Sequence, residues 1–196
     1  FILQHVPSAF HVVLISRRSI PLSLSRLKAQ QQLLELTSID LVFSREETAL
    51  LCSEIFQVQW DRNLLDRMHD LTEGWVSGMV LFHHAFSDLR RDDMQKFLDQ
   101  SHSLPDPVAD YLEEEVFSPL ASEIKDFLLQ TSILNRLRAS FCDKWLEIDA
   151  SQRILTHLAN NHLFLKKERV EGSGYVYHNL FRIFLQKKLT TLSSPE

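Results

Sequence analysis

A change of pattern near residue 163 places the tightest limit on the fold. Before it, apolar residues recur at helical spacing in four successive segments, residues 108–117, 122–130, 141–145 and 151–160. Two β-rich runs follow, Leu163–Leu165 and Tyr175–Tyr177, separated by charged residues and by Gly172-Ser173-Gly174. Helices followed by a two-stranded hairpin with a glycine-rich tip predict a winged helix. A last helix is predicted from Asn179 to about Leu189, with its apolar side chains pointing inward: Leu180, Phe181, Phe184 and Leu185.

Residues 44–104 predict a small helical bundle. The segment Ser44–Glu47 is a capping box, in which the first hydroxyl accepts a bond from the third amide and the final carboxylate reaches back. Gly74 can end a later helix, because glycine tolerates the left-handed conformation. A helix from Trp75 to about Phe86 is apolar on most sides, so we expect it at the centre of the bundle. A further helix is expected around residues 92–100.

Residues 1–43 have the pattern of the closing strands of an α/β sheet. His11–Ile15 is an apolar run stopped by a hydroxyl and two arginines, which predicts a strand buried on both faces. A short helix around Leu24–Ala29 and a second strand near Leu33–Leu36 follow, as in a parallel sheet. Ligands bind at the carboxyl ends of such strands, so Arg17 could sense an anionic ligand. The alternative is a solvated arginine at a strand end.

Composition excludes several classes of function. A net charge of −5 and a pI near 6.0 argue against a chain that clamps nucleic acid along its whole length. Cys52 and Cys142 lie far apart without metal-ligand spacing, so buried reduced thiols are expected. No stretch of about 18 apolar residues predicts a membrane span. The four glycines form no phosphate-binding loop. We therefore expect the chain to be part of a larger nucleotide-binding protein whose phosphate loop precedes it.

The order of these segments resembles the MalT-type ATP-dependent regulators, a branch of the signal-transduction ATPases with numerous domains. The resemblance covers nearly the whole chain, although each matching piece is short. The matching pieces are the first strand with Ser16-Arg17; Pro21-Leu22, Leu24 and Arg26-Leu27; Leu33-Leu34-Glu35-Leu36, Asp40-Leu41, Phe43 and Glu46-Glu47; Thr72-Glu73-Gly74-Trp75 and Gly78; Tyr111-Leu112, Glu114-Glu115-Val116, Asp126-Phe127-Leu128-Leu129 and Thr131-Ser132; and Asn161-His162-Leu163-Phe164-Leu165 with Tyr177-His178-Asn179-Leu180-Phe181-Arg182.

The resemblance implies a mainly α chain with three parts. Residues 1–43 would be the C-terminal end of a nucleotide-binding α/β core, residues 44–104 a helical lid, and residues 105–196 a winged-helix domain. It implies a cytoplasmic, bacterial transcriptional activator that couples ATP or ADP, with Mg²⁺, to inducer sensing and self-association. An inducer-sensing domain and a LuxR-type DNA-binding helix-turn-helix would follow residue 196. The parent protein would be a slow ATPase, whereas this part alone should neither hydrolyse ATP nor bind it tightly.

The resemblance also implies nucleotide-contacting residues. Arg17 would approach the terminal phosphate, with Arg18 as a competing candidate. Gly74 and Trp75 resemble a lid motif near the adenine, where glycine allows close approach and an indole offers a stacking face; the alternative is a helix cap and a core side chain. His178 resembles a winged-helix histidine that touches the β-phosphate of ADP. Its alternative is a histidine at a helix start, bonded to backbone.

Two other classes of function stay open. A stand-alone winged-helix protein could bind DNA through its basic residues, and a helical adaptor could offer its faces to a protein partner. Glu168 and Glu171 reduce the positive charge of the hairpin. The basic residues of the late part are Arg136, Arg138, Arg153, Lys166, Lys167 and Arg169.

Overall fold

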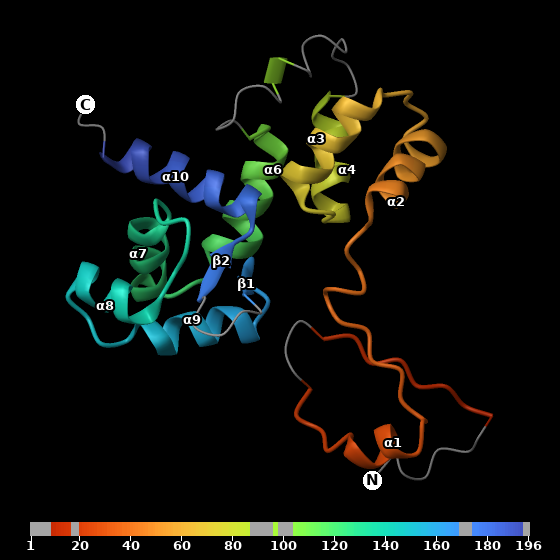
Figure 1. Cartoon of the computed structure of the whole chain (residues 1–196), viewed down its shortest axis with the longest axis horizontal. Helices are drawn as coiled ribbons and strands as arrows, with labels where there is room; N and C mark the ends of the chain where they lie inside the picture. Colours follow the sequence, from red (N-terminus) through yellow and green to blue (C-terminus); the bar gives the residue numbers. More distant parts are fainter. Residues whose placement is uncertain (1–8, 17–19, 87–95, 98–103, 169–173, 194–196) are drawn as a thin grey trace.

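The computed structural model describes residues 9–16, 20–86, 96–97, 104–168 and 174–193, and this part of the chain is mainly helical (Figure 1). The elements in chain order are α1 (Ser25–Ala29), α2 (Arg45–Leu50), the π-helical turn η2 (Leu51–Ile55), α3 (Arg62–Thr72), α4 (Val76–Phe86), α6 (Asp106–Tyr111), the π-helical turn η3 (Leu112–Phe117), α7 (Ser122–Thr131), α8 (Ala139–Leu146), α9 (Ser151–Asn160), β1 (Leu165–Lys167), β2 (Tyr175–Tyr177) and α10 (Asn179–Ser193).

The two strands predicted in residues 1–43 do not form. His11–Ile15 and Leu33–Leu36 have no regular structure, and Val13 and Ile15 are 81% and 95% exposed. A strand is stabilised by hydrogen bonds to neighbouring strands and by burial of its faces. Within the described residues the sheet consists of β1 and β2 alone, so neither run has a partner. The short helix does form as α1, and this helix lies apart from the helical body (Figure 1).

The predicted helical bundle is present as α2, α3 and α4. The capping box is confirmed: Ser44 Oγ accepts from the Glu47 amide at 3.2 Å, and the Glu47 carboxylate accepts from the Ser44 amide at 2.8 Å. Met79 and Phe82 of α4 are almost fully buried, as expected for a central helix. Of the helix predicted at residues 92–100, only residues 96–97 lie among the described ones, and they are helical.

The winged-helix order is also confirmed. Helices α7, α8 and α9 are followed by the antiparallel hairpin, in which Leu165 pairs with Tyr177 and Lys167 with Tyr175. The Tyr177 hydroxyl lies 2.7 Å from Thr131 Oγ1, which ties the hairpin to the buried end of α7.

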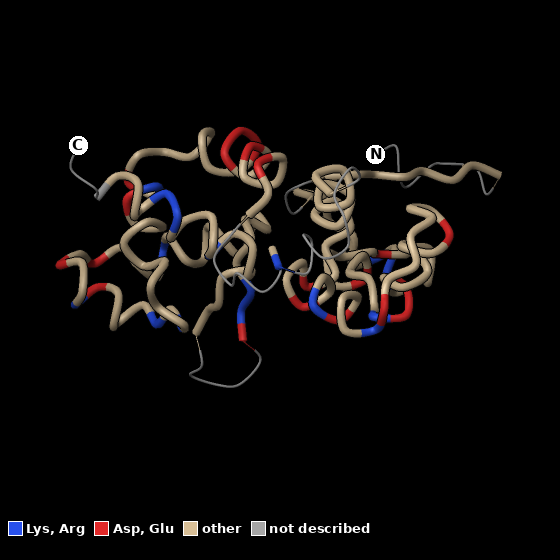
Figure 2. Tube along the Cα trace, turned by 90° about the horizontal axis from the view of Figure 1, so that it is seen from above, with Lys and Arg blue, Asp and Glu red and all other residues tan. Residues whose placement is uncertain are grey.

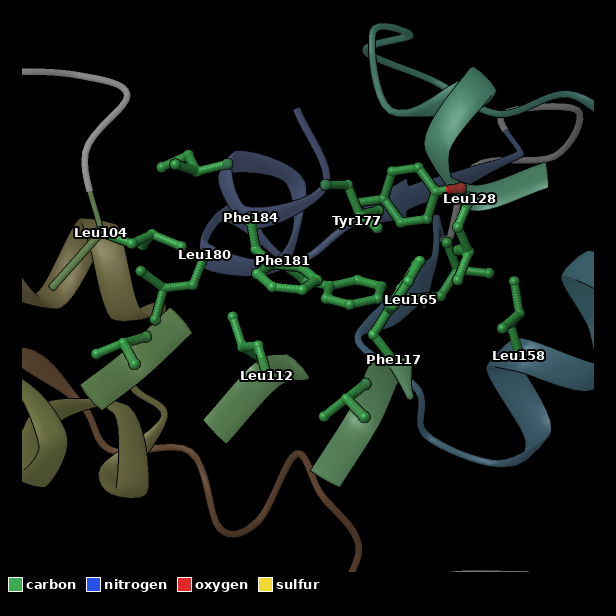
Figure 3. Close-up of a cluster of buried hydrophobic side chains, with 14 of the residues drawn as sticks. Leu104, Leu112, Phe117, Leu128, Leu158, Leu165, Tyr177, Leu180, Phe181 and Phe184 are labelled. Atoms are coloured by element: carbon green, nitrogen blue, oxygen red, sulfur yellow. The ribbon is translucent and has the colours of Figure 1, made fainter. Parts of the chain in front are cut away.

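Helix α10 carries the centre of the hydrophobic core (Figure 3). Phe181 is fully buried, with ring centroids 5.5 Å from Phe164, 6.2 Å from Tyr177 and 6.0 Å from Phe184. The predicted inward face of this helix is confirmed. The buried cluster is continuous from α3 and α4, through α6 and η3, to the winged helix. The bundle of α2, α3 and α4 and the winged helix are therefore packed neighbours, with α6 between them (Figure 1).

Candidate functional site

A cluster of polar contacts lies where the end of α3 meets the start of α10. Helix α3 ends at Thr72, and the next two residues, Glu73 and Gly74, are left-handed with φ of 49° and 77°. A Cβ on Gly74 would lie 2.4 Å from the carbonyl oxygen of Phe43. Glycine is therefore needed here for both its backbone angle and the close approach of another segment. The predicted helix end is confirmed, with Glu73 as the capping residue one position earlier.

His178 stands between β2 and α10 and is 6% exposed. Its Nε2 donates to the Thr72 carbonyl at 3.0 Å, and its main-chain N–H donates to the Phe164 carbonyl at 2.8 Å. The imidazole packs edge-on against Trp75 and Phe164, with centroids 6.1 and 5.4 Å away. Its Nδ1 is buried without a hydrogen-bond partner. A neutral imidazole with the proton on Nε2 suits this arrangement, because Nδ1 then has no hydrogen left unpaired.

Glu73 joins the two sides of this junction. One carboxylate oxygen accepts a hydrogen bond from the main-chain N–H of Asn179 at 2.9 Å. The other forms an ion pair with Lys166 of β1 and lies 4.0 Å from His178 Nε2. The carboxylate thus contacts a strand and a helix that follow it by about ninety residues or more.

The surroundings shift both titratable groups. Burial lowers the pKa of His178, and the nearby Lys166 ammonium acts in the same direction; the Glu73 carboxylate and the Thr72 carbonyl oppose them. Burial acts to raise the pKa of Glu73. A charged His178, the Lys166 ammonium and the Asn179 amide act against burial and hold that pKa below its ordinary value; while the imidazole is neutral, Lys166 and the amide supply this effect. The arrangement therefore favours a neutral imidazole beside an ionised carboxylate.

Three of the four residues predicted to contact nucleotide come together at this junction: Gly74, Trp75 and His178. Trp75 is partly buried, with ring contacts to Tyr111, Phe164 and His178. Gly74 ends a helix and Trp75 packs on the core, which agrees with the structural alternative stated for each. Their contact with nucleotide stays a prediction. Arg17 and Arg18 lie outside the described residues.

The sequence interpretation missed the roles of Glu73 and Lys166. In the sequence, Glu73 stands out only as part of the Thr72–Trp75 motif and Lys166 only as one of several basic residues. Their ion pair joins residues 93 positions apart, and no periodicity or motif signals a contact across such a separation. A left-handed glutamate at a helix end is also unusual, because that conformation favours glycine or asparagine.

Comparisons with known proteins find similarity over the C-terminal part and beyond it. Residues 113–196 match the family model described as MalT winged helix domain. The chain is 29% identical to the HTH-type transcriptional regulator MalT of Vibrio cholerae over 185 residues, covering 94% of this chain and 20% of that relative. The protein of the same name from Yersinia enterocolitica is 28% identical over 195 residues, covering 96% of this chain and 21% of the relative.

The predicted resemblance to MalT regulators is confirmed. The MalT of Serratia proteamaculans is similar as well, at 26% identity over 193 residues. This chain spans about a fifth of the length of the curated relatives it matches. Residues 113–196 are therefore similar to the MalT winged helix domain, and the residues that precede them align with the same MalT proteins.

Along the described part of the chain, Lys and Arg residues are interspersed with Asp and Glu residues and do not gather on one face (Figure 2). Three of the basic residues considered for DNA contact form ion pairs: Arg136 with Glu168, Arg153 with Glu123, and Lys166 with Glu73. In the part that the structure describes, no helix is long and apolar enough to cross a bilayer. The same residues contain no group of three or more His, Cys, Asp or Glu side chains able to hold a metal ion.

Proposed function

We propose that this chain is the central part of an ATP- and ADP-switched transcriptional activator of the MalT type. In this proposal residues 1–43 complete a nucleotide-binding core, residues 44–104 form its lid, and residues 105–196 form the winged-helix domain that the lid contacts. Similarity to MalT proteins over 94–96% of the chain supports the assignment, because it extends well beyond the winged helix. The whole protein would act in the bacterial cytoplasm, sensing an inducer and binding DNA through further domains.

The observation that carries the switch is the position of His178. It is buried at the junction between the proposed lid and winged helix, with Nε2 bound to Thr72 and Nδ1 unpartnered. An orphaned buried ring nitrogen fits a ligand oxygen. Because Nε2 keeps its proton for Thr72, Nδ1 would donate to a phosphate only in the imidazolium form, and the negative charge of the bound phosphate would favour that protonation. ADP, once bound by the core, would supply that anion. His178 would then retain its backbone bond to the lid and add a contact to the nucleotide.

A ligand shifts an equilibrium only through different contacts with its two states. We propose that ADP stabilises the closed arrangement through His178 and that exchange for ATP, sensed by Arg17, releases the winged helix. Hydrolysis by the whole protein, with Mg²⁺, would restore the ADP form. Self-association and transcription activation would follow from the released state.

The full-length protein containing this chain provides the test. His178→Ala should lower the amount of ADP that copurifies and should raise transcription in the absence of inducer. His157→Ala is the matched control, because His157 is an exposed histidine of the same domain. Unchanged ADP content and unchanged basal transcription in His178→Ala would contradict the switch. Titration of labelled duplex DNA with this chain in rising salt addresses the alternative, because a DNA-binding winged helix would show a steep salt dependence.

A further inference from the structure

The junction between α3 and α10 contains a polar connection that needs no nucleotide. Helix α10 begins at Asn179, and the first amides of any helix lack partners within it. The preceding residue, His178, would ordinarily supply the cap, and its carbonyl does accept the first helical bond from Arg182 at 3.0 Å. Its side chain, however, points its Nε2 to the Thr72 carbonyl. The start of α10 is therefore left for another side chain to cap.

Glu73, at the end of α3, caps the start of α10. Its carboxylate accepts from the Asn179 amide at 2.9 Å, so a negative charge lies at the positive end of a 15-residue helix. The second oxygen pairs with Lys166 on β1. Glu73 is 28% exposed at its side chain and Lys166 is 56% exposed, so the carboxylate is the more enclosed partner.

We propose that Glu73 is an intramolecular latch, which caps α10 and pairs with Lys166 to hold the end of α3 against the winged-helix domain. Three polar contacts then lie at the junction between α3 and α10: Glu73 with Asn179, Glu73 with Lys166, and His178 with Thr72. Separation of α3 from α10 breaks all three together. An autoinhibitory role for this latch rests on the proposed function. The three contacts themselves are present whether or not that function holds.

The latch predicts a local effect of substitution at Glu73 in the nucleotide-free chain. Glu73→Ala removes both carboxylate contacts, so the Asn179 amide should exchange with deuterium roughly tenfold faster, the size expected for loss of one helix cap. Glu73→Gln should have a smaller effect, since its amide oxygen can still accept from Asn179. Glu114→Ala is the matched control, because it removes an exposed glutamate from η3. Residue-resolved hydrogen exchange by NMR measures all three variants.

A double-mutant cycle tests the ion pair. Lys166→Met alone should also accelerate exchange at Asn179, and adding it to Glu73→Ala should accelerate it no further. Additive effects would overturn the latch, as would an Asn179 exchange rate unchanged by Glu73→Ala. Equal acceleration throughout α7, α8 and α9 would also overturn it, since that indicates general destabilisation. Absence of ADP from the full-length protein would contradict the nucleotide switch and leave these exchange rates unaffected.

Discussion

Replacement of Gly74 by alanine tests the physical account of the α3 end. The backbone at Gly74 has φ of 77°, and an added Cβ would lie 2.4 Å from the Phe43 carbonyl oxygen and 2.5 Å from Val42 Cγ1. The left-handed angle costs an alanine about 1–2 kcal/mol. The clash is with backbone, so residues 42–43 must move, and the bond from the Phe43 amide to the Gly74 carbonyl at 3.0 Å weakens.

Loss of that bond adds about 1 kcal/mol, and the reduced freedom of the unfolded alanine chain offsets about 0.5–1 kcal/mol. The net loss is thus roughly 2 kcal/mol, combining these terms. With a urea dependence of about 2 kcal/mol per molar, the unfolding midpoint should fall by about 1 M. Urea titration followed by far-UV circular dichroism measures it.

Ser77→Ala is the control for this experiment, because Ser77 is exposed on α4 and the substitution adds no atom. Its free energy of unfolding should change by no more than about 0.5 kcal/mol. If Gly74→Ala were as stable as wild type, the close approach of Phe43 would not be a constraint, and the structural explanation for this glycine would be wrong.

Other substitutions examine the core, a second helix end and the buried histidine. Phe181→Ala should lower the free energy of unfolding by about 3–5 kcal/mol, because it empties a fully buried site; a loss below about 1 kcal/mol in calorimetry would argue against its central place. Glu147→Gly should stabilise the chain by up to about 1 kcal/mol, since Glu147 caps α8 at φ of 54°, and a lower melting temperature would refute this. Burial lowers the pKa of His178, which faces Glu73 and Lys166. The folded state therefore disfavours its protonation, and stability should fall as pH drops through the unfolded value near 6.5. His178→Gln should flatten this part of the pH profile between about pH 7.5 and 5.5, and identical profiles would show that His178 does not titrate on unfolding.

Features set by neighbours in the chain could be read from the sequence. The capping box at Ser44–Glu47, the helix ranges of the winged helix and the inward face of α10 all depend on residues three or four positions apart, and all are confirmed. The observed hairpin lies within a few residues of the predicted one, since a change from a helical to a β-rich pattern is also local. Local capping and periodicity thus sufficed for the helical body.

Contacts between distant residues needed the tertiary structure. A strand forms only where another strand pairs with it, so the apolar pattern at His11–Ile15 could not by itself produce a sheet. The candidate site likewise depends on contacts that the sequence does not reveal. Sequence reasoning placed Gly74 and His178 among the candidate residues, yet only the packing of α3 against α10 brought them within one junction. The Glu73 carboxylate meets its partners there across 93 and 106 positions of chain, and a contact of that range depends on how the intervening helices pack.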